Sequence, residues 1–62
     1  MDAEKMQTIL AMMRHEYSLY SVSQLRAACN RRKFIQDFTL FGNVLTESEM
    51  TELFDLLIKE RT

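Results

Sequence analysis

Cys29 and His15 are the only cysteine and the only histidine in the chain, and together they could supply a nucleophile and its base. A cysteine nucleophile needs a base within hydrogen-bonding reach and a third group that orients the base. The sequence offers neither a Gly-rich turn nor an evident third group, and so small a domain has little room for an enclosed substrate pocket. We therefore predict no catalytic site, with Cys29 as a small buried residue and His15 as a solvated helix residue.

Acidic side chains recur at spacings of three near the C-terminus, at Glu49, Glu52 and Asp55. Such a row could attract a cation, but it lacks the loop that supplies the other oxygen ligands of a calcium site. A structural zinc needs about four ligands, and Cys29 with His15 would supply only two. We expect no metal and no cofactor, and we interpret the acidic row as the solvated face of an amphipathic helix.

A basic cluster lies in the middle of the chain, where Arg26, Asn30 and Lys33 recur at spacings of four and three and Arg31 and Arg32 lie next to them. A helical face of this kind can contact phosphates. The sequence pI is about 5.7, and no aromatic residue is interleaved among the charges to stack on bases. DNA binding by a small transcriptional regulator is therefore the alternative hypothesis.

The charges are unevenly divided along the chain. Residues 21–42 carry four cations against one acid, whereas residues 43–62 carry five acids against two cations. A basic middle and an acidic end attract each other, either within one fold or between molecules. Pairing of the basic cluster with the acidic C-terminal segment or with an acidic partner is therefore favoured over phosphate binding.

The last helix has the clearest sequence signals, and we predict it over residues 47–60. Thr46 and Glu49 have the spacing of a capping box, in which each side chain bonds the other residue's backbone N–H. Leu45 before the cap and Met50 after it form the pair of a hydrophobic staple. Apolar residues then follow at helical spacing, which predicts one buried stripe.

The middle helix begins with the same pattern, because Ser21 and Gln24 can form a second capping box. Its apolar stripe can be followed as far as Phe41, and Gly42 is a suitable residue to end a helix. The polar run that begins at Asn30 interrupts this stripe. We therefore predict a helix that can reach Phe41, with a possible break near Asn30.

The first helix is predicted to begin near Asp2, which is a good N-cap residue. Its apolar residues are spaced by four and three in alternation, as in a helix that packs against another helix. They are Met6, Leu10, Met13, Tyr17 and Tyr20.

A β-hairpin is the competing prediction for residues 38–45, because Gly42-Asn43 suits a tight turn between two apolar runs. An isolated hairpin is marginal in water, and the sequence shows no further strand to pair with it. We therefore favour helix here. The predicted fold is an all-α, compact three-helix bundle that forms a single domain over residues 1–62.

Large apolar side chains (Met, Ile, Leu, Val, Phe and Tyr) number 24 among the 62 residues, more than three short helices can bury between themselves. A domain of this size is also marginally stable alone. We therefore predict a homodimer or a partner protein that covers the surplus, and a role as a regulator, adaptor or inhibitor. The residues predicted to bind the partner are Met12, Tyr17, Tyr20, Phe34, Phe38 and Phe41.

Three features predict a cytoplasmic protein without a membrane or small-molecule partner. Cys29 has no second cysteine for a disulfide, as is usual in a reducing compartment. The chain starts with an acid at Asp2, where a signal peptide carries positive charge. No apolar run approaches the roughly 18 residues that cross a bilayer.

Overall fold

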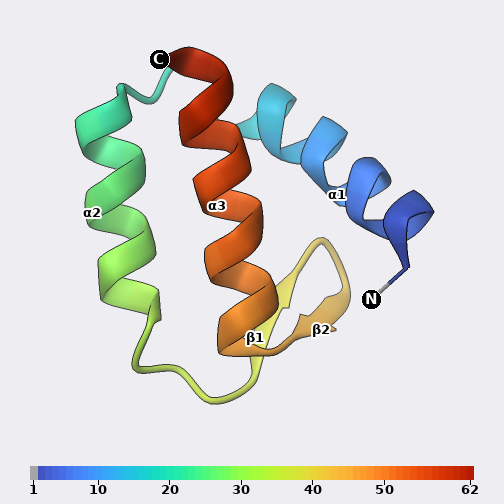
Figure 1. Ribbon diagram of the computed structural model, residues 1–62. Coiled ribbons are helices and arrows are strands. Elements are labelled where there is room, and N and C mark those ends of the chain that lie inside the picture. Colours follow the sequence, from blue (N-terminus) through green and yellow to red (C-terminus); the bar gives the residue numbers. More distant parts are fainter. Residues whose placement is uncertain (1) are drawn as a thin grey trace.

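The computed structural model describes residues 2–62, which form three helices and one two-stranded antiparallel sheet (Figure 1). The elements are α1 (Ala3–Glu16), α2 (Val22–Arg32), β1 (Phe38–Leu40), β2 (Asn43–Leu45) and α3 (Glu47–Arg61). The chain is mostly helical and compact, as predicted. The all-α prediction is wrong for residues 38–45, which form a hairpin.

Helix α3 begins at the predicted capping box. The Thr46 hydroxyl accepts from the Glu49 N–H at 3.1 Å, and the Glu49 carboxylate accepts from the Thr46 N–H at 3.0 Å. The second of these bonds lowers the pKa of Glu49. The staple pair Leu45 and Met50 is buried, and the stripe of α3 supplies Leu53, Phe54 and Leu57 to the core. Local signals and packing therefore specify the same element.

Helix α2 has the predicted capping box between Ser21 and Gln24, with bonds of 2.8 and 3.2 Å. It ends at Arg32, so the prediction that it could continue to Phe41 is wrong, and the chain leaves the helix shortly after the predicted break. Residues 33–37 form an irregular connection to β1. A continued helix would have carried Phe38 away from the position in which it enters the core.

The hairpin pairs Phe38 with Leu45, Thr39 with Val44 and Leu40 with Asn43. Its two loop residues, Phe41 and Gly42, have φ of 52° and 78°, the sign that a type I′ turn requires at both positions. This hairpin is not isolated, because Phe38, Leu40 and Leu45 on its inner face are buried in the core. Tertiary packing therefore supplies the stability that an isolated two-stranded hairpin would lack.

Helix α1 begins at the predicted cap, where the Asp2 carboxylate accepts from the Lys5 N–H at 2.7 Å. It ends at Glu16, and Tyr17 leaves the helix with its side chain buried. Figure 1 shows α3 between α2 and α1, with α2 and α3 running in opposite directions. All three helices and both strands contribute to one core.

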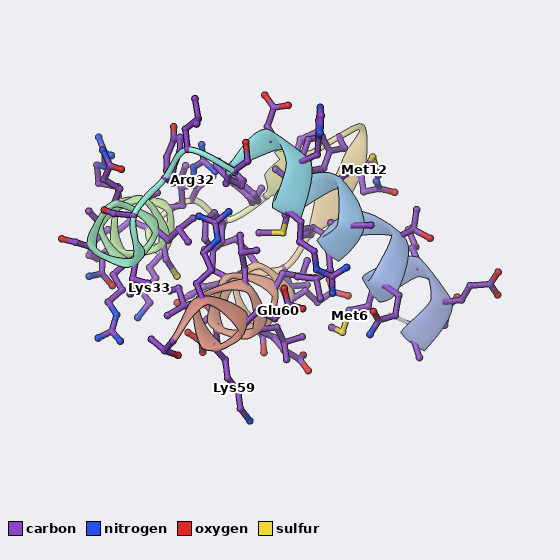
Figure 2. All side chains as sticks on the ribbon, turned by 90° about the horizontal axis from the view of Figure 1, so that it is seen from above. Met6, Met12, Arg32, Lys33, Lys59 and Glu60 are labelled. Atoms are coloured by element: carbon purple, nitrogen blue, oxygen red, sulfur yellow. The ribbon has the colours of Figure 1, made fainter. Side chains whose placement is uncertain are left out.

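Three arginines fasten the helices to one another. Arg14 of α1 donates two hydrogen bonds to the Glu60 carboxylate, at 2.8 and 2.5 Å, and Figure 2 shows Glu60 directed from α3 toward α1. Arg61 donates to the backbone carbonyls of Tyr17 and Tyr20 in the α1–α2 connection. Arg32 of α2 donates to the Tyr17 hydroxyl at 2.9 Å. Each of these cations is engaged within the fold by a carboxylate, a backbone carbonyl or a hydroxyl group. None of the helices within residues 2–62 has the length and apolar character needed to cross a bilayer.

Candidate functional site

Large apolar side chains remain exposed after the core is complete. Phe34 is 91% exposed and Val44 is 68% exposed, so neither contributes much to the stability of the isolated chain. The large apolar residues exposed within residues 2–62 are Met12, Leu19, Tyr20, Phe34, Ile35, Phe41 and Val44. This surplus was predicted from the composition, although it could not be located there.

Met12 and Phe41 line one hollow, of about 430 Å³, between the outer face of α1 and the tip of the hairpin. Figure 2 shows Met12 on the side of α1 that faces the hairpin, opposite Met6. Ala11, His15 and Glu16 complete the lining, which therefore combines apolar side chains with one imidazole and one carboxylate. The hollow can accept an apolar side chain without exposing it to a strong field of either sign.

The Phe41 backbone is strained. A positive φ costs an L-residue about 1–2 kcal/mol, and type I′ turns strongly prefer Asn, Asp or Gly at this position. The ring of Phe41 is 36% exposed, so the strain does not serve to bury it fully in the core. Backbone strain that is not offset by burial of the side chain is often found at functional sites.

The structure separates the six predicted partner-binding residues into two groups. Tyr17 and Phe38 lie in the core, where the Tyr17 ring packs 5.6 Å from the ring of Phe54 and Arg32 lies 4.9 Å from the Phe38 centroid. Removing either would damage the fold before it affected a partner. The exposed members are Met12, Tyr20, Phe34 and Phe41, of which Met12 and Phe41 share a hollow.

The five residues of the basic cluster are also divided. Arg32 is turned inward, as described above, while Arg26, Asn30 and Lys33 line a second hollow, between α2 and α3. Within residues 2–62, Arg26, Arg31 and Lys33 have no hydrogen bond or ion pair, and the predicted pairing with α3 is not formed within the chain. Asp55 also lines this second hollow, which opposes the approach of a phosphate backbone.

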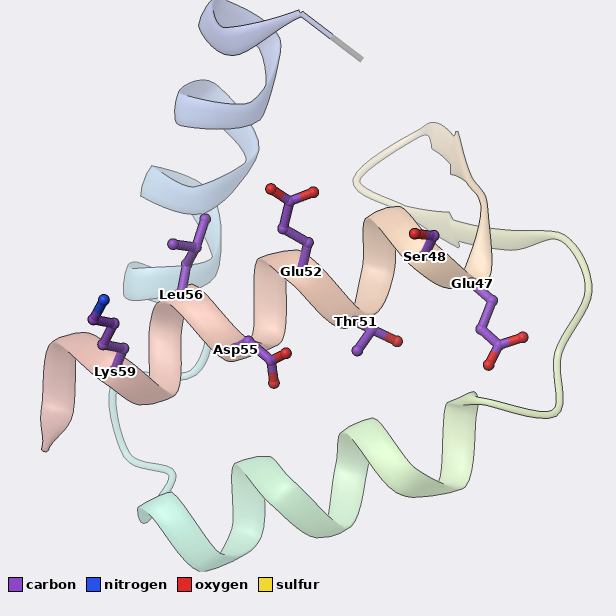
Figure 3. A pocket seen from close by; sticks show the side chains of 7 residues that line it. All are labelled: Glu47, Ser48, Thr51, Glu52, Asp55, Leu56 and Lys59. Carbon is purple, nitrogen blue, oxygen red and sulfur yellow. The ribbon is translucent and has the colours of Figure 1, made fainter.

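A third hollow, of about 560 Å³, runs along the outer face of α3 (Figure 3). Glu47 and Asp55 leave the helix on the side of α2 in Figure 3, and Glu52 leaves it on the side of α1. Leu56 and Thr51 are among the less polar residues of its lining, and they leave α3 on opposite sides. All seven lining residues belong to α3, so this hollow lies on the polar face that the spacing of its acids predicted.

Cys29 and His15 do not share a hollow. His15 is exposed on α1 beside Met12, whereas Cys29 is buried on α2 and lines the second hollow. Burial raises the pKa of the Cys29 thiol and so disfavours the nucleophilic thiolate. Among residues 2–62, no three His, Cys, Asp or Glu side chains are arranged to hold a metal ion.

Comparison of the chain with protein-family models, with curated proteins and with solved structures finds no match.

Proposed function

We propose that this chain is a small, non-catalytic interaction protein that acts as a regulator, adaptor or inhibitor by covering part of another protein. The observation that carries the proposal is the Met12–Phe41 hollow, in which a strained turn holds an aromatic ring beside an exposed methionine. Aromatic residues carry much of the binding energy at protein interfaces, and methionine adapts to irregular partner surfaces.

The lining of the hollow indicates the chemistry of the occupant. Its side walls carry one acid, Glu16, and one base, His15, so it suits a partner with a large apolar side chain and a nearly neutral surround. Charged side chains make up more of the lining of the other two hollows, four in the α3 hollow and three in the hollow between α2 and α3. An apolar anchor would lose less solvation energy by entering the Met12–Phe41 hollow than by entering either of the others.

DNA binding remains the alternative function, but nothing in the arrangement favours it over protein binding. The inward position of Arg32 reduces the basic face to Arg26, Asn30, Arg31 and Lys33, and the acids of α3 lie beside that face. A phosphate backbone along α2 would meet this negative field.

Site-specific photo-crosslinking in the native host tests the proposal. A photo-reactive aromatic amino acid at position 41 or 12 should give the same protein adduct, and the adduct formed from position 41 should be lost on Met12→Glu. Gln7 is exposed on α1 and lines none of the three hollows, so a probe at position 7 is the matched control. Equal labelling from positions 7, 12 and 41, or adducts removed by nuclease, would contradict the proposal.

A further inference from the structure

We propose that the hollow between α2 and α3 binds a short acidic peptide segment of a partner protein, with Arg26 and Lys33 each holding one carboxylate. The hollow has a volume of about 410 Å³ and shares no lining residue with the Met12–Phe41 hollow. The inference rests on the proposed function in one respect, because the ligand is again part of a protein. It adds the charge and the spacing that this second surface recognises.

Three polar side chains of α2 line this hollow from one side of the helix. Arg26, Asn30 and Lys33 are separated by four and three residues, so an α-helix places them on one face. Lys33 is the C-cap of α2 and keeps helical backbone angles, and Figure 2 shows it on the side of α2 turned toward α3. All three are exposed, and none has a side-chain hydrogen bond or ion pair within residues 2–62. Two cations and one amide are therefore available to an incoming ligand.

The distance between the two cations indicates how many anionic groups the ligand carries. Arg26 and Lys33 are seven residues apart, which corresponds to about 10 Å along an α-helix. A single carboxylate would contact both only if the two side chains turned toward each other, which would bring like charges together. Short peptides commonly adopt the polyproline II conformation, in which residues three apart lie on the same side, about 9 Å from each other. A peptide with two acids separated by two other residues therefore matches both cations.

Asp55 of α3 determines which charge the middle of the ligand can carry. Cys29 lies between Arg26 and Lys33 along α2 and lines the same hollow. Burial is the main cause of the raised pKa of the Cys29 thiol, but Lys33 also lowers this pKa and Asp55 raises it, so both charges lie near the thiol. Asp55 therefore repels an anionic group in the middle of the hollow. A nucleic-acid strand, which carries a phosphate at every nucleotide, meets this repulsion, whereas a peptide with a neutral middle does not.

The neutral residues of the lining suit the part of the peptide between its two acids. Asn30 can donate to a backbone carbonyl and accept from a backbone N–H. Such groups are unpaired within a polyproline II peptide. Ile58 of α3 is half-buried and adds an apolar surface. The charged lining residues are two cations and one acid, which is complementary to a ligand that is acidic overall.

An NMR titration of the isotope-labelled chain tests the site with two blocked peptides of the same composition. The probe is AEAAEA, and the matched control is AAEEAA, in which the acids are adjacent. The probe should shift the backbone amides of α2 and α3 that border the hollow. It should bind about two- to fivefold more tightly than the control, because adjacent acids leave one of the two cations without a partner.

Variants of the chain test the role of each charge. Arg26→Gln and Lys33→Gln should each weaken binding of AEAAEA by about two- to fivefold, since each removes one charge pair. Lys5→Gln removes the same charge from α1, outside the three hollows, and should leave the affinity unchanged. Asp55→Asn should strengthen binding of the peptide AEEEEA more than binding of AEAAEA. A variant that had merely unfolded could not bind more tightly.

The outcomes separate this inference from the proposed function. Amide shifts around the hollow between α2 and α3, with none at Met12 or Phe41, are the result expected. Equal affinity for AEAAEA and AAEEAA, or no shifts at millimolar peptide, would overturn the acidic-peptide site and leave the crosslinking from positions 12 and 41 unaffected. Peptide binding without that crosslinking would contradict the Met12–Phe41 proposal alone.

Two other occupants of the hollow would also be recognised in the titration. Tighter binding of DNA than of a peptide of equal charge would replace the acidic-peptide site with the nucleic-acid alternative. Shifts around the hollow that depend on the concentration of the chain alone would assign it to a second copy instead.

Discussion

Helix α3 and the segment 33–45 differ in how their residues are used. Within α3, the capping box, the charges at its two ends and the apolar stripe all favour the same element, and none of its large apolar side chains is exposed. Segment 33–45 contains Phe34, Ile35, Phe41 and Val44, four of the seven large apolar residues exposed within residues 2–62. Both regions supply buried residues to the core, but large apolar side chains that the isolated fold leaves exposed are concentrated in 33–45.

The largest expected effect is the difference in unfolding free energy between removing one aromatic ring from α3 and removing one from segment 33–45. Phe54 of α3 is fully buried, so Phe54→Ala should lower the free energy of unfolding by about 3–5 kcal/mol, enough to unfold much of the population of so small a domain. Phe34→Ala removes the same kind of ring from an exposed position and should change the free energy of unfolding by less than about 0.5 kcal/mol. Urea denaturation, at a protein concentration too low for any dimer to form, measures both changes in the free energy of unfolding. Comparable losses for the two variants would remove the distinction between the regions.

Substitutions of Gly42 test whether the hairpin turn requires a positive φ at this position. A Cβ at this position would meet no atom within 4 Å, so Gly42→Ala is not opposed by packing. Its φ of 78° is nevertheless unfavourable for alanine, and the substitution should cost about 1 kcal/mol or more. Gly42→Asn should cost less, because Asn tolerates positive φ better. Thermal melts of the two variants measure the difference, and equal melting temperatures would show that the turn relaxes freely.

The sequence was most informative where the signals were local. Both capping boxes involve residues three apart, and both were found at the predicted positions. The end of α2 was not predictable in the same way, because the apolar residues from Phe34 to Phe41 fit a helical stripe as well as a strand. The choice is made by Phe38, Leu40 and Leu45, which enter a core built from distant parts of the chain.

The residues of the candidate site could not be located from the sequence for the same reason. Tyr17 and Phe41 are both aromatic residues at the edge of an apolar run, yet one is buried against Phe54 and the other lines a surface hollow. Composition predicted a surplus of apolar side chains but not which ones would be exposed. The unpaired charges of α2 could likewise be identified only once the position of α3 was known.

Thr46 joins the two regions, because it follows β2 and caps α3. Thr46→Ala removes the hydroxyl that accepts from the Glu49 N–H and should cost about 1 kcal/mol. Thr46→Ser retains an acceptor and should lose much less. The bond from the Thr46 N–H to the Glu49 carboxylate does not depend on the hydroxyl, so the cost should stay below that of losing the whole cap. Urea unfolding of the two variants measures this, and equal losses would indicate a packing role for the threonine methyl group instead.

The smallest expected effect is a dependence of stability on pH, which α3 should confer through Glu60. The hydrogen bond from Arg14 lowers the pKa of Glu60 below its ordinary value. A carboxylate with a lowered pKa in the folded state stabilises the fold above its unfolded pKa, which is about 4.3 for Glu, and this contribution is lost as the pH falls through the folded pKa. Unfolding experiments between pH 7 and pH 2 should therefore show a smaller loss of stability on acidification for Arg14→Gln than for the parent chain.

Lys59→Gln is the control, because it changes an exposed cation on α3 with no hydrogen bond or ion pair within residues 2–62, and it should leave the pH dependence of stability unchanged. An unaltered acid profile in Arg14→Gln would mean that the Arg14–Glu60 pair contributes nothing to the attachment of α1, and that packing alone holds α1 against α3.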